Sequence, residues 1–356
     1  MPLIVEGSQV PPRWLERKAF ARVVMPRSTP KSDYLRIALI NNMPDAALED
    51  TEMQFFDLLD EASGELPVVV QLFSLAGVPR SERGIQHLNR YYFELNDLWN
   101  SQFDALIMTG TEPKCADLRK EPYWGALIDV FDWAERNTTS TILSCLAAHA
   151  NVLHSDGIER QRLGEKRVGV FPFTVHNNHA LLRAIGRTVR FPHSRWNEVS
   201  PSSLRSAGYT ILTDSSETEV DSFVKPKKRS LFVLFQGHPE YSADTLLREY
   251  RRDIKRFLRR ESPTFPKIPF GYLDTASAGL LAQFQQHVLR HPFEESIAAF
   301  PDKEVTKNVR KVWQRSSSLI YRNWLQYIVQ KRVSRSTFIT IASGRSTALT
   351  DACSDH

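Results

Sequence analysis

Residues 139–150 read TSTILSCLAAHA, and the change of pattern inside this stretch decides the fold. A β-favouring run ends at Ser144, and an alanine-rich run typical of a helix begins at Leu146. Cys145 lies at the turn between them, a tight elbow that exposes the side chain, and the positive end of the helix dipole favours a thiolate there. We therefore predict that Cys145 is a nucleophile and that the amide of Leu146 stabilises an oxyanion. The alternative interpretation is a buried, inert cysteine.

Short apolar runs and helical patterns alternate on both sides of this stretch. Such alternation is typical of an α/β protein with a three-layer, doubly wound and mostly parallel sheet. In these sheets reactive groups lie beyond the carboxyl ends of the strands, so the segments that follow the strands are expected to meet there. The predicted strands are residues 35–40, 68–73, 103–108, 139–144 and 230–235, and the predicted helices are residues 47–59, 124–136, 146–153, 248–260, 280–289 and 318–330.

Composition divides the chain into four parts. Residues 1–34 are rich in Pro, Arg and Lys and are expected to form an N-terminal arm over the surface. Residues 35–260 carry the alternating pattern and are expected to form the main α/β domain. Residues 261–333 combine proline-rich turns with helical patterns, which suits a C-terminal helical addition that packs on this domain. Residues 334–356 are rich in Ser and Thr, so we expect a flexible tail.

Composition also limits the classes of function. The chain has 356 residues and 42% hydrophobic composition, enough for a large packed core. Its 46 basic and 41 acidic residues leave only a mild positive excess, so nucleic acid is not an expected partner. Three widely spaced cysteines do not describe a disulfide framework. The N-terminus has no secretory pattern and no apolar stretch approaches about 18 residues, so we expect no membrane association and a cytoplasmic location.

A second motif follows the apolar run at residues 231–235, where the chain reads His238-Pro239-Glu240. A thiol nucleophile needs a base within hydrogen-bond reach, and the base needs an orienting partner. A glutamate two residues beyond the histidine, after a kinking proline, can turn back onto the ring. Alone, the motif also describes a structural loop histidine. Paired with Cys145 at the same sheet edge, it predicts a Cys-His-Glu set.

Other polar residues carry weaker signals. His149 lies one helical turn after Cys145 and is interpreted as a polar core residue. Residues 193–195 follow a short strand and either place an arginine at the site or form a surface turn. The basic run at residues 248–260 is an amphipathic helix with a solvated face or a site for carboxylate or phosphate groups. Because no zinc spacing and no glycine-rich phosphate motif is present, neither a metal nor a bound cofactor is expected.

Further motifs are Asn42-Met43-Pro44, Thr51-Glu52, residues 87–92, residues 103–110, Pro192-His193-Ser194-Arg195, Gly237-His238-Pro239-Glu240-Tyr241 and Glu249-Tyr250-Arg251-Arg252-Asp253. Together with Cys145, they resemble a known family, the homoserine O-succinyltransferases, including homoserine O-acetyltransferases of the same fold. The resemblance covers roughly residues 35–329. It implies a fold similar to that of class I glutamine amidotransferases over the main domain, residues 35–260.

The resemblance also implies a catalytic triad of Cys145, His238 and Glu240. It implies a ping-pong reaction of methionine biosynthesis, in which an acyl group passes from acyl-CoA to the cysteine and then to the hydroxyl of homoserine. Acyl-CoA is then a co-substrate, the other substrate is a small amino acid, and a homodimer is the expected assembly.

The resemblance also implies substrate-binding residues. Arg252 matches the family's substrate-binding arginine and would hold the amino-acid carboxylate bidentately. Ser194 and Arg195 are further candidates. Lys114 stands where family members carry the Gly or Glu that is associated with succinyl or acetyl preference, and its charge favours a succinyl carboxylate.

The chain departs from the family's pattern at several positions. Residues 45–47 read Asp-Ala-Ala where family members usually carry lysines, one of which supports the oxyanion site. Leu146 replaces a usual aromatic residue, and His149 replaces a usual glutamine. The segment 262–315 is longer than its equivalent in the family. These departures leave three hypotheses: acyl transfer to homoserine or a relative such as serine, an amidotransferase-like hydrolase, and a non-catalytic relative.

Overall fold

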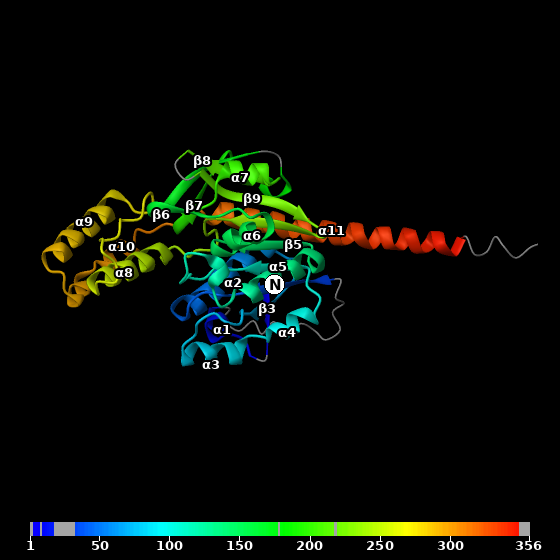
Figure 1. The fold of residues 1–356 in the computed structure, drawn as a ribbon, viewed down its shortest axis with the longest axis horizontal. Coiled ribbons are helices and arrows are strands. Elements are labelled where there is room, and N and C mark those ends of the chain that lie inside the picture. The colour runs from blue at the N-terminus through cyan, green and yellow to red at the C-terminus, as the bar shows by residue number, and fades with distance from the viewer. Residues whose placement is uncertain (1–2, 8, 18–32, 177–178, 217–218, 349–356) are drawn as a thin grey trace, which may run out of the picture.

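A ten-stranded sheet forms the centre of the molecule, in the order β1-β3-β2-β4-β5-β10-β9-β8-β6-β7 (Figure 1). The computed structural model describes residues 3–7, 9–17, 33–176, 179–216 and 219–348. Strands β1 to β10 span Leu3–Glu6, Leu35–Ile40, Val68–Phe73, Ala105–Met108, Ser140–Ser144, Gln161–Val175, Thr188–Glu198, Thr210–Ser215, Glu219–Lys227 and Ser230–Phe235. In this order, neighbouring strands are parallel from β1 through β3, β2, β4 and β5 to β10. The remaining neighbours, β10-β9, β9-β8, β8-β6 and β6-β7, are antiparallel.

Helices cover both faces of this sheet. They are α1 Pro12–Arg17, α2 Asp45–Ser63, α3 Glu82–Tyr91, α4 Leu95–Trp99, α5 Trp124–Asn137, α6 Leu146–Asp156, α7 Pro201–Ser206, α8 Thr245–Leu258, α9 Thr275–Arg290, α10 Asp302–Thr306 and α11 Gln314–Ala348, with short 3-10 turns η2 Leu118–Lys120, η3 Ala180–Leu182 and η4 Glu294–Ala299. Along β2, Ile37 and Leu39 face a core shared with α2, α8 and α11, whereas Ala38 and Ile40 face a core shared with α5 and α6. The predicted α/β class, with three layers and a mostly parallel sheet, is confirmed.

The five predicted strands are β2, β3, β4, β5 and β10, with ends within two residues of the prediction. An additional strand lies in the segment for which the sequence predicts a surface arm. Leu3, Ile4 and Val5 of β1 are buried and pair in parallel with β3 at the edge of the sheet. Four residues are enough for this pairing, and the Pro- and Arg-rich composition of the surrounding segment conceals them. Residues 18–32 of the predicted arm lie outside the described part of the chain.

The antiparallel strands β6 to β9 were not predicted as a unit. The sequence predicts that residues 193–195 follow a strand, but they lie inside β7, which pairs with β6 over most of its length. Pro192 interrupts the apolar run and suggests a strand end. It is tolerated because β7 is the edge strand of the sheet, where one side of the strand has no neighbouring strand to hydrogen-bond with.

The C-terminal helices pack against the main domain. Figure 1 shows α8, α9 and α10 together at one end of the molecule, and the last part of α11 extending beyond the sheet at the other end. The ion pairs Arg251–Asp302 (3.0 Å) and Arg259–Glu294 (2.6 Å) join α8 to the segment 262–315. The backbone of α11 continues to Ala348, past the start of the predicted flexible tail at residue 334. Within the described residues, no helix is both long enough and apolar enough to cross a membrane.

Candidate active site

Cys145 occupies a strained backbone turn between β5 and α6. Its φ of 52° and ψ of −110° lie in a region that side-chain-bearing residues rarely adopt. The turn is fixed on both sides: the Cys145 amide donates to Phe235 O (2.8 Å), and its carbonyl accepts from the His149 amide (3.2 Å). Ala147 and Ala148 are buried, which lets the helix start close to the sheet. The predicted elbow is therefore present in the structure.

The loop after β10 lies beside this elbow. Phe235, the last residue of β10, pairs with Ser144, the last residue of β5, so both chains leave the sheet together. His238 and Glu240 are buried, and His238 Nδ1 donates to Glu240 Oε1 over 2.8 Å. The hydroxyl of Ser144 also donates to Glu240 Oε1 (3.3 Å). The three residues of the predicted Cys-His-Glu set are thus brought together.

The electrostatics of this set favour a charged imidazole. Burial by itself lowers the pKa of His238 because the interior solvates an imidazolium poorly. The negative charges of Glu240 and Cys145, together with hydrogen bonds to both, outweigh burial and raise the pKa well above its usual value. An imidazolium beside a thiolate is the resting arrangement that a cysteine nucleophile requires.

The backbone of Gly110 lies against the start of α6, next to the elbow. A Cβ atom on Gly110 would lie 2.8 Å from Leu146 Cβ and 2.9 Å from Leu146 N, so only glycine fits against the start of α6. In the described part of the chain, neither the Gly110 amide nor the Leu146 amide donates a hydrogen bond. Thr109 fixes the loop, because its hydroxyl accepts from the Asn42 amide (2.8 Å) and donates to Gly110 O (3.0 Å). Unpaired backbone amides beside a nucleophile are the donors from which an oxyanion hole can be built.

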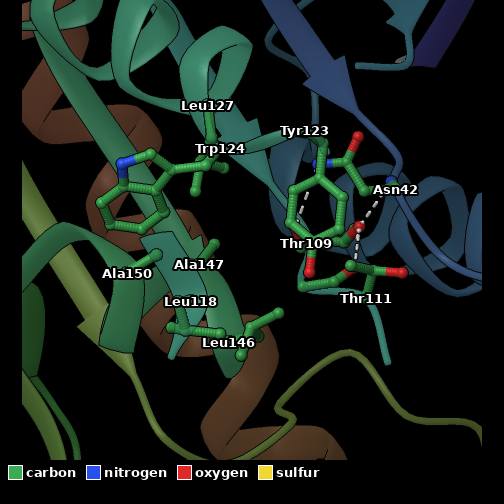
Figure 2. A pocket seen from close by; sticks show the side chains of 11 residues that line it. Asn42, Thr109, Thr111, Leu118, Tyr123, Trp124, Leu127, Leu146, Ala147 and Ala150 are labelled. Carbon is green, nitrogen blue, oxygen red and sulfur yellow. Dashed lines mark hydrogen bonds between the residues drawn. The ribbon is translucent and has the colours of Figure 1, made fainter. Parts of the chain in front are cut away.

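A small pocket opens at these amides, and Figure 2 shows its two kinds of wall. Apolar side chains of Trp124, Leu127 and Leu118 form one side, and Asn42 and Thr109 form the other. Further lining residues are Gly110, Thr111, Tyr123, Leu146, Ala147 and Ala150.

The loop at residues 41–45 is held by an arginine that the sequence did not indicate. Arg80 donates to the carbonyls of Met43 and Asn41 and to Asp45 Oδ1. Burial tends to raise the pKa of Asp45, but hydrogen bonds from Ser81 and the charge of Arg80 hold it below its usual value. An ion pair between Arg80 and Asp45 thus fixes the start of α2 against this loop.

Two arginines direct positive charge toward Cys145. Arg195 is buried, and its Nε donates to His193 Nδ1 (3.1 Å) and its Nη1 to Asn197 O (2.7 Å). Burial is the main cause that lowers its pKa to about 10, and the charge of Cys145 acts in the opposite sense. Arg160, which the sequence did not indicate, donates to Ala116 O (3.0 Å); burial lowers its pKa while Cys145 again opposes the shift. Both arginines therefore place positive charge near Cys145.

Arg252 lies on a face of α8 that carries several charged groups. Its Nε donates to Asp253 Oδ1 (3.1 Å), and the other oxygen of Asp253 accepts from Lys166 Nζ of β6 (2.5 Å). Burial opposes ionisation of Arg252, but the charges of Glu249 and Asp253 raise its pKa. Glu249 also accepts from the hydroxyl of Tyr241 (2.9 Å). Sequence reasoning assigned no role to Lys166, Tyr241 or Glu249. Lys166 reaches this face only because β6 lies against α8.

The remaining predicted residues lie further from this cluster. Ser194 is half-buried on β7 opposite Val168, and Lys114 is exposed on the loop that follows β4. Among the described residues, neither makes a hydrogen bond or an ion pair with Cys145 or His238. His149 is buried and its Nε2 lies 2.9 Å from Gln236 Oε1, which confirms its interpretation as a polar core residue.

The chain is similar to known proteins over most of its length. A family model described as homoserine O-succinyltransferase matches residues 15–335. A homoserine O-succinyltransferase of Rhodopseudomonas palustris is 42% identical over 87% of this chain and 90% of its own, and one of Methylorubrum extorquens is 39% identical over 91% and 96%. Among solved structures, a glutamine amidotransferase of Thermotoga maritima aligns with a TM-score of 0.42 and 11% identity, over 83% of this chain and 98% of its own.

The family match and the close relatives define an enzyme of the acyltransferase class that acts on small molecules. Within that class, the chain belongs to the homoserine O-succinyltransferase family.

Proposed function

We propose that this protein transfers a succinyl group from succinyl-CoA to the hydroxyl of L-homoserine through a thioester on Cys145. The observation that carries the proposal is the positive-φ elbow at Cys145 beside the buried His238–Glu240 pair, in a chain that belongs to this family. The product serves methionine biosynthesis in the cytoplasm, and the reaction uses acyl-CoA as a co-substrate with no bound cofactor or metal.

In the first half-reaction the thiolate of Cys145 attacks the thioester carbonyl of succinyl-CoA. The amides of Leu146 and Gly110 stabilise the negative oxygen of the tetrahedral intermediate. The bond to the CoA sulfur then breaks, and the imidazolium of His238 gives its proton to that sulfur. CoA leaves as a thiol, the enzyme keeps the acyl group as a thioester, and His238 becomes neutral.

In the second half-reaction neutral His238 removes the proton from the hydroxyl of homoserine, and the oxygen attacks the acyl carbonyl. The same two amides stabilise the second intermediate. Breaking of the C–S bond releases O-succinylhomoserine and restores the thiolate of Cys145 beside an imidazolium. Glu240 accepts from Nδ1 throughout, so it keeps the other ring nitrogen directed toward the reacting atoms and stabilises the charged ring.

Substrate binding is assigned to the charged face of α8 and to the two strands beside it. Arg252 holds the carboxylate of homoserine bidentately, with Lys166 as a second cation next to it. Ser194 of β7 lies on the same side of the sheet region, and Arg195 acts from its buried position by stabilising negative charge at the thiolate. Lys114 pairs with the distal carboxylate of the succinyl group, which favours succinyl over acetyl.

The test is release of CoA thiol by the purified protein, with succinyl-CoA or acetyl-CoA crossed against homoserine, serine and no acceptor. We expect release with succinyl-CoA and homoserine, a succinyl adduct on Cys145 by mass spectrometry without acceptor, and loss of both in Cys145→Ala. Cys115→Ser is the matched control, because Cys115 is the other partly exposed free thiol in the described part of the chain.

Other outcomes distinguish the alternatives. Release with serine alone would reassign the acceptor, and release with acetyl-CoA alone would reassign the donor. Ammonia release from glutamine would support a hydrolase. No release with any pair and no adduct would overturn the acyltransferase proposal for this chain. Sedimentation of the purified protein tests the homodimer.

A further inference from the structure

Tyr241 lies directly against the proposed base. Its ring stacks on the imidazole of His238, with ring centroids 4.2 Å apart and planes inclined by 16°. Both side chains are buried, so the tyrosine ring covers one face of the imidazole and keeps water from it. A ring held in this way restricts rotation of the imidazole about its bond to Cβ.

Tyr241 is itself held at three points. Its amide donates to His238 O (3.2 Å), and its carbonyl accepts from Trp313 Nε1 just before α11 (3.0 Å). Its hydroxyl donates to Glu249 Oε1 of α8 (2.9 Å). The first two bonds involve the backbone and need no particular side chain. Only the third bond requires a tyrosine, and a phenylalanine would stack equally well without it.

The third bond reaches the helix that carries the proposed acceptor site. Glu249 lies three residues before Arg252, so the two side chains share one face of α8. The charge of Glu249 is the largest cause that raises the pKa of Arg252 against the effect of burial. The Tyr241 hydroxyl thus connects the ring stacked on the base with the carboxylate beside the proposed anchor of the amino acid.

We propose that Tyr241 is a positioning residue that holds His238 at a fixed position relative to the acceptor-binding face of α8. This proposal rests on the acyl transfer proposed above. The ring fixes the plane of the imidazole. The hydroxyl ties that plane to Glu249, so that the base and the homoserine hydroxyl meet at a fixed distance in the second half-reaction.

The chemistry of the phenol suits this role. Burial is the main cause, followed by the charge of Glu249, that raises the pKa of Tyr241 well above its ordinary value. The hydroxyl therefore stays protonated and remains a donor over the whole pH range in which the enzyme works, so the hydrogen bond from Tyr241 to Glu249 is kept. The tie is not needed for acylation of Cys145, because acyl-CoA does not require the face of α8 that binds the amino acid.

The test separates the two half-reactions in Tyr241→Phe, Tyr241→Leu and the control Tyr250→Phe. Tyr250 is a fully buried tyrosine of α8 whose hydroxyl makes no hydrogen bond among the described residues. Acylation is measured as the burst of CoA thiol without acceptor, and transfer as the decay of the isolated acyl-enzyme against homoserine concentration.

We expect Tyr241→Phe to lower the ratio of transfer rate to acylation rate at least tenfold, and Tyr250→Phe to keep the wild-type ratio. Tyr241→Leu, which also removes the stacking, is expected to slow both steps. A wild-type ratio in Tyr241→Phe would overturn the proposal, and so would an equal fall of both rates accompanied by a lower melting temperature. Absence of an acyl-enzyme in the wild type would instead remove the proposed function itself.

Discussion

The two halves of the sheet contribute to the site in different ways. The parallel half acts through its backbone: the elbow at Cys145 and the amides of Gly110 and Leu146 follow from how β4 and β5 end. The antiparallel half acts through buried side chains, where His193 Nε2 lies 3.2 Å from Asp221 Oδ1 and its other nitrogen accepts from Arg195. The position of backbone amides at a strand end depends on the local sequence. The strength of a buried network of polar side chains depends instead on strand register and on the desolvation of each group.

Glu240 lies on the loop that follows β10, the strand at which the two halves meet, and its loss should have the largest effect. In Glu240→Gln we expect kcat/KM to fall by about 10²- to 10⁴-fold, since the amide keeps the shape but not the charge. Burial lowers the pKa of His238 and the charge of Glu240 is the largest opposing cause, so the imidazolium would be lost at lower pH in the variant. The measurement is kcat/KM between pH 5.5 and 9.

The graded control for this prediction is Ser144→Ala, which removes only the 3.3 Å hydrogen bond to Glu240. A loss of about tenfold is expected there, because a hydrogen bond to a charged group contributes about 1.5–3 kcal/mol and the length of 3.3 Å places this one at the weak end. If Glu240→Gln kept more than a tenth of wild-type kcat/KM at every pH, the charge of Glu240 would not matter to the chemistry.

The backbone contribution of the parallel half is tested by Gly110→Ala. The added Cβ would contact Leu146 N and Cβ below 3 Å, so the start of α6 must move. We expect kcat to fall by roughly 10²-fold through displacement of the oxyanion amides, and stability to fall by about 1–3 kcal/mol. Gly125→Ala is the control, since a Cβ on Gly125 in α5 meets nothing within 4 Å. Unchanged kcat in Gly110→Ala would exclude the Gly110 amide from the oxyanion hole.

The same contrast explains how much was predictable from the sequence. Periodicity predicted β2, β3, β4, β5 and β10, because a strand buried on both faces is a continuous apolar run. The rule that loops meet beyond the carboxyl ends of parallel strands then predicted that Cys145 and His238 lie together. Their catalytic roles stay predictions, but their juxtaposition is in the structure.

The antiparallel strands were missed for physical reasons. The first half of β6 is exposed and charged, and β7 contains Pro192, so neither reads as a buried run. Lys166 reaches Asp253 only because β6 lies against α8, and a contact between residues so far apart in sequence leaves no local pattern.

Buried histidines on both sides of the junction predict a loss of stability in acid. Burial is the main cause that lowers the pKa of His149 to about 3 and that of His193 to about 4, against an ordinary value near 6.5. At a pH between the ordinary value and these lowered values, the two histidines bind protons in the unfolded chain but not in the folded chain. This part of the stability is therefore complete above pH 6.5 and is lost as the pH falls toward the folded values.

The variant His149→Gln divides this loss between the two halves. From pH 6.5 to pH 5 we expect the wild type to lose ~2 kcal/mol through His149 alone, and the variant to keep that amount because glutamine does not titrate. The loss that remains in the variant includes the contributions of His193 in the antiparallel half and of His179, whose pKa burial also lowers. Urea unfolding at both pH values measures the difference. Equal losses in the two proteins would show that His149 accepts its proton without unfolding.

The smallest expected effect concerns the strain of the elbow itself. At the φ of 52° and ψ of −110° of Cys145, an alanine keeps the strain, which costs about 1–3 kcal/mol, whereas a glycine relieves it. Glycine also loses more conformational entropy on folding, by roughly 0.5–1 kcal/mol. Cys145→Gly should therefore unfold at higher urea than Cys145→Ala, by ~1 kcal/mol. In α5, where the backbone is regularly helical, Ala126→Gly should change stability in the opposite direction by a similar amount. If Cys145→Gly were the less stable of the two elbow variants, the elbow would hold no strain, and the parallel half would position the nucleophile by packing alone.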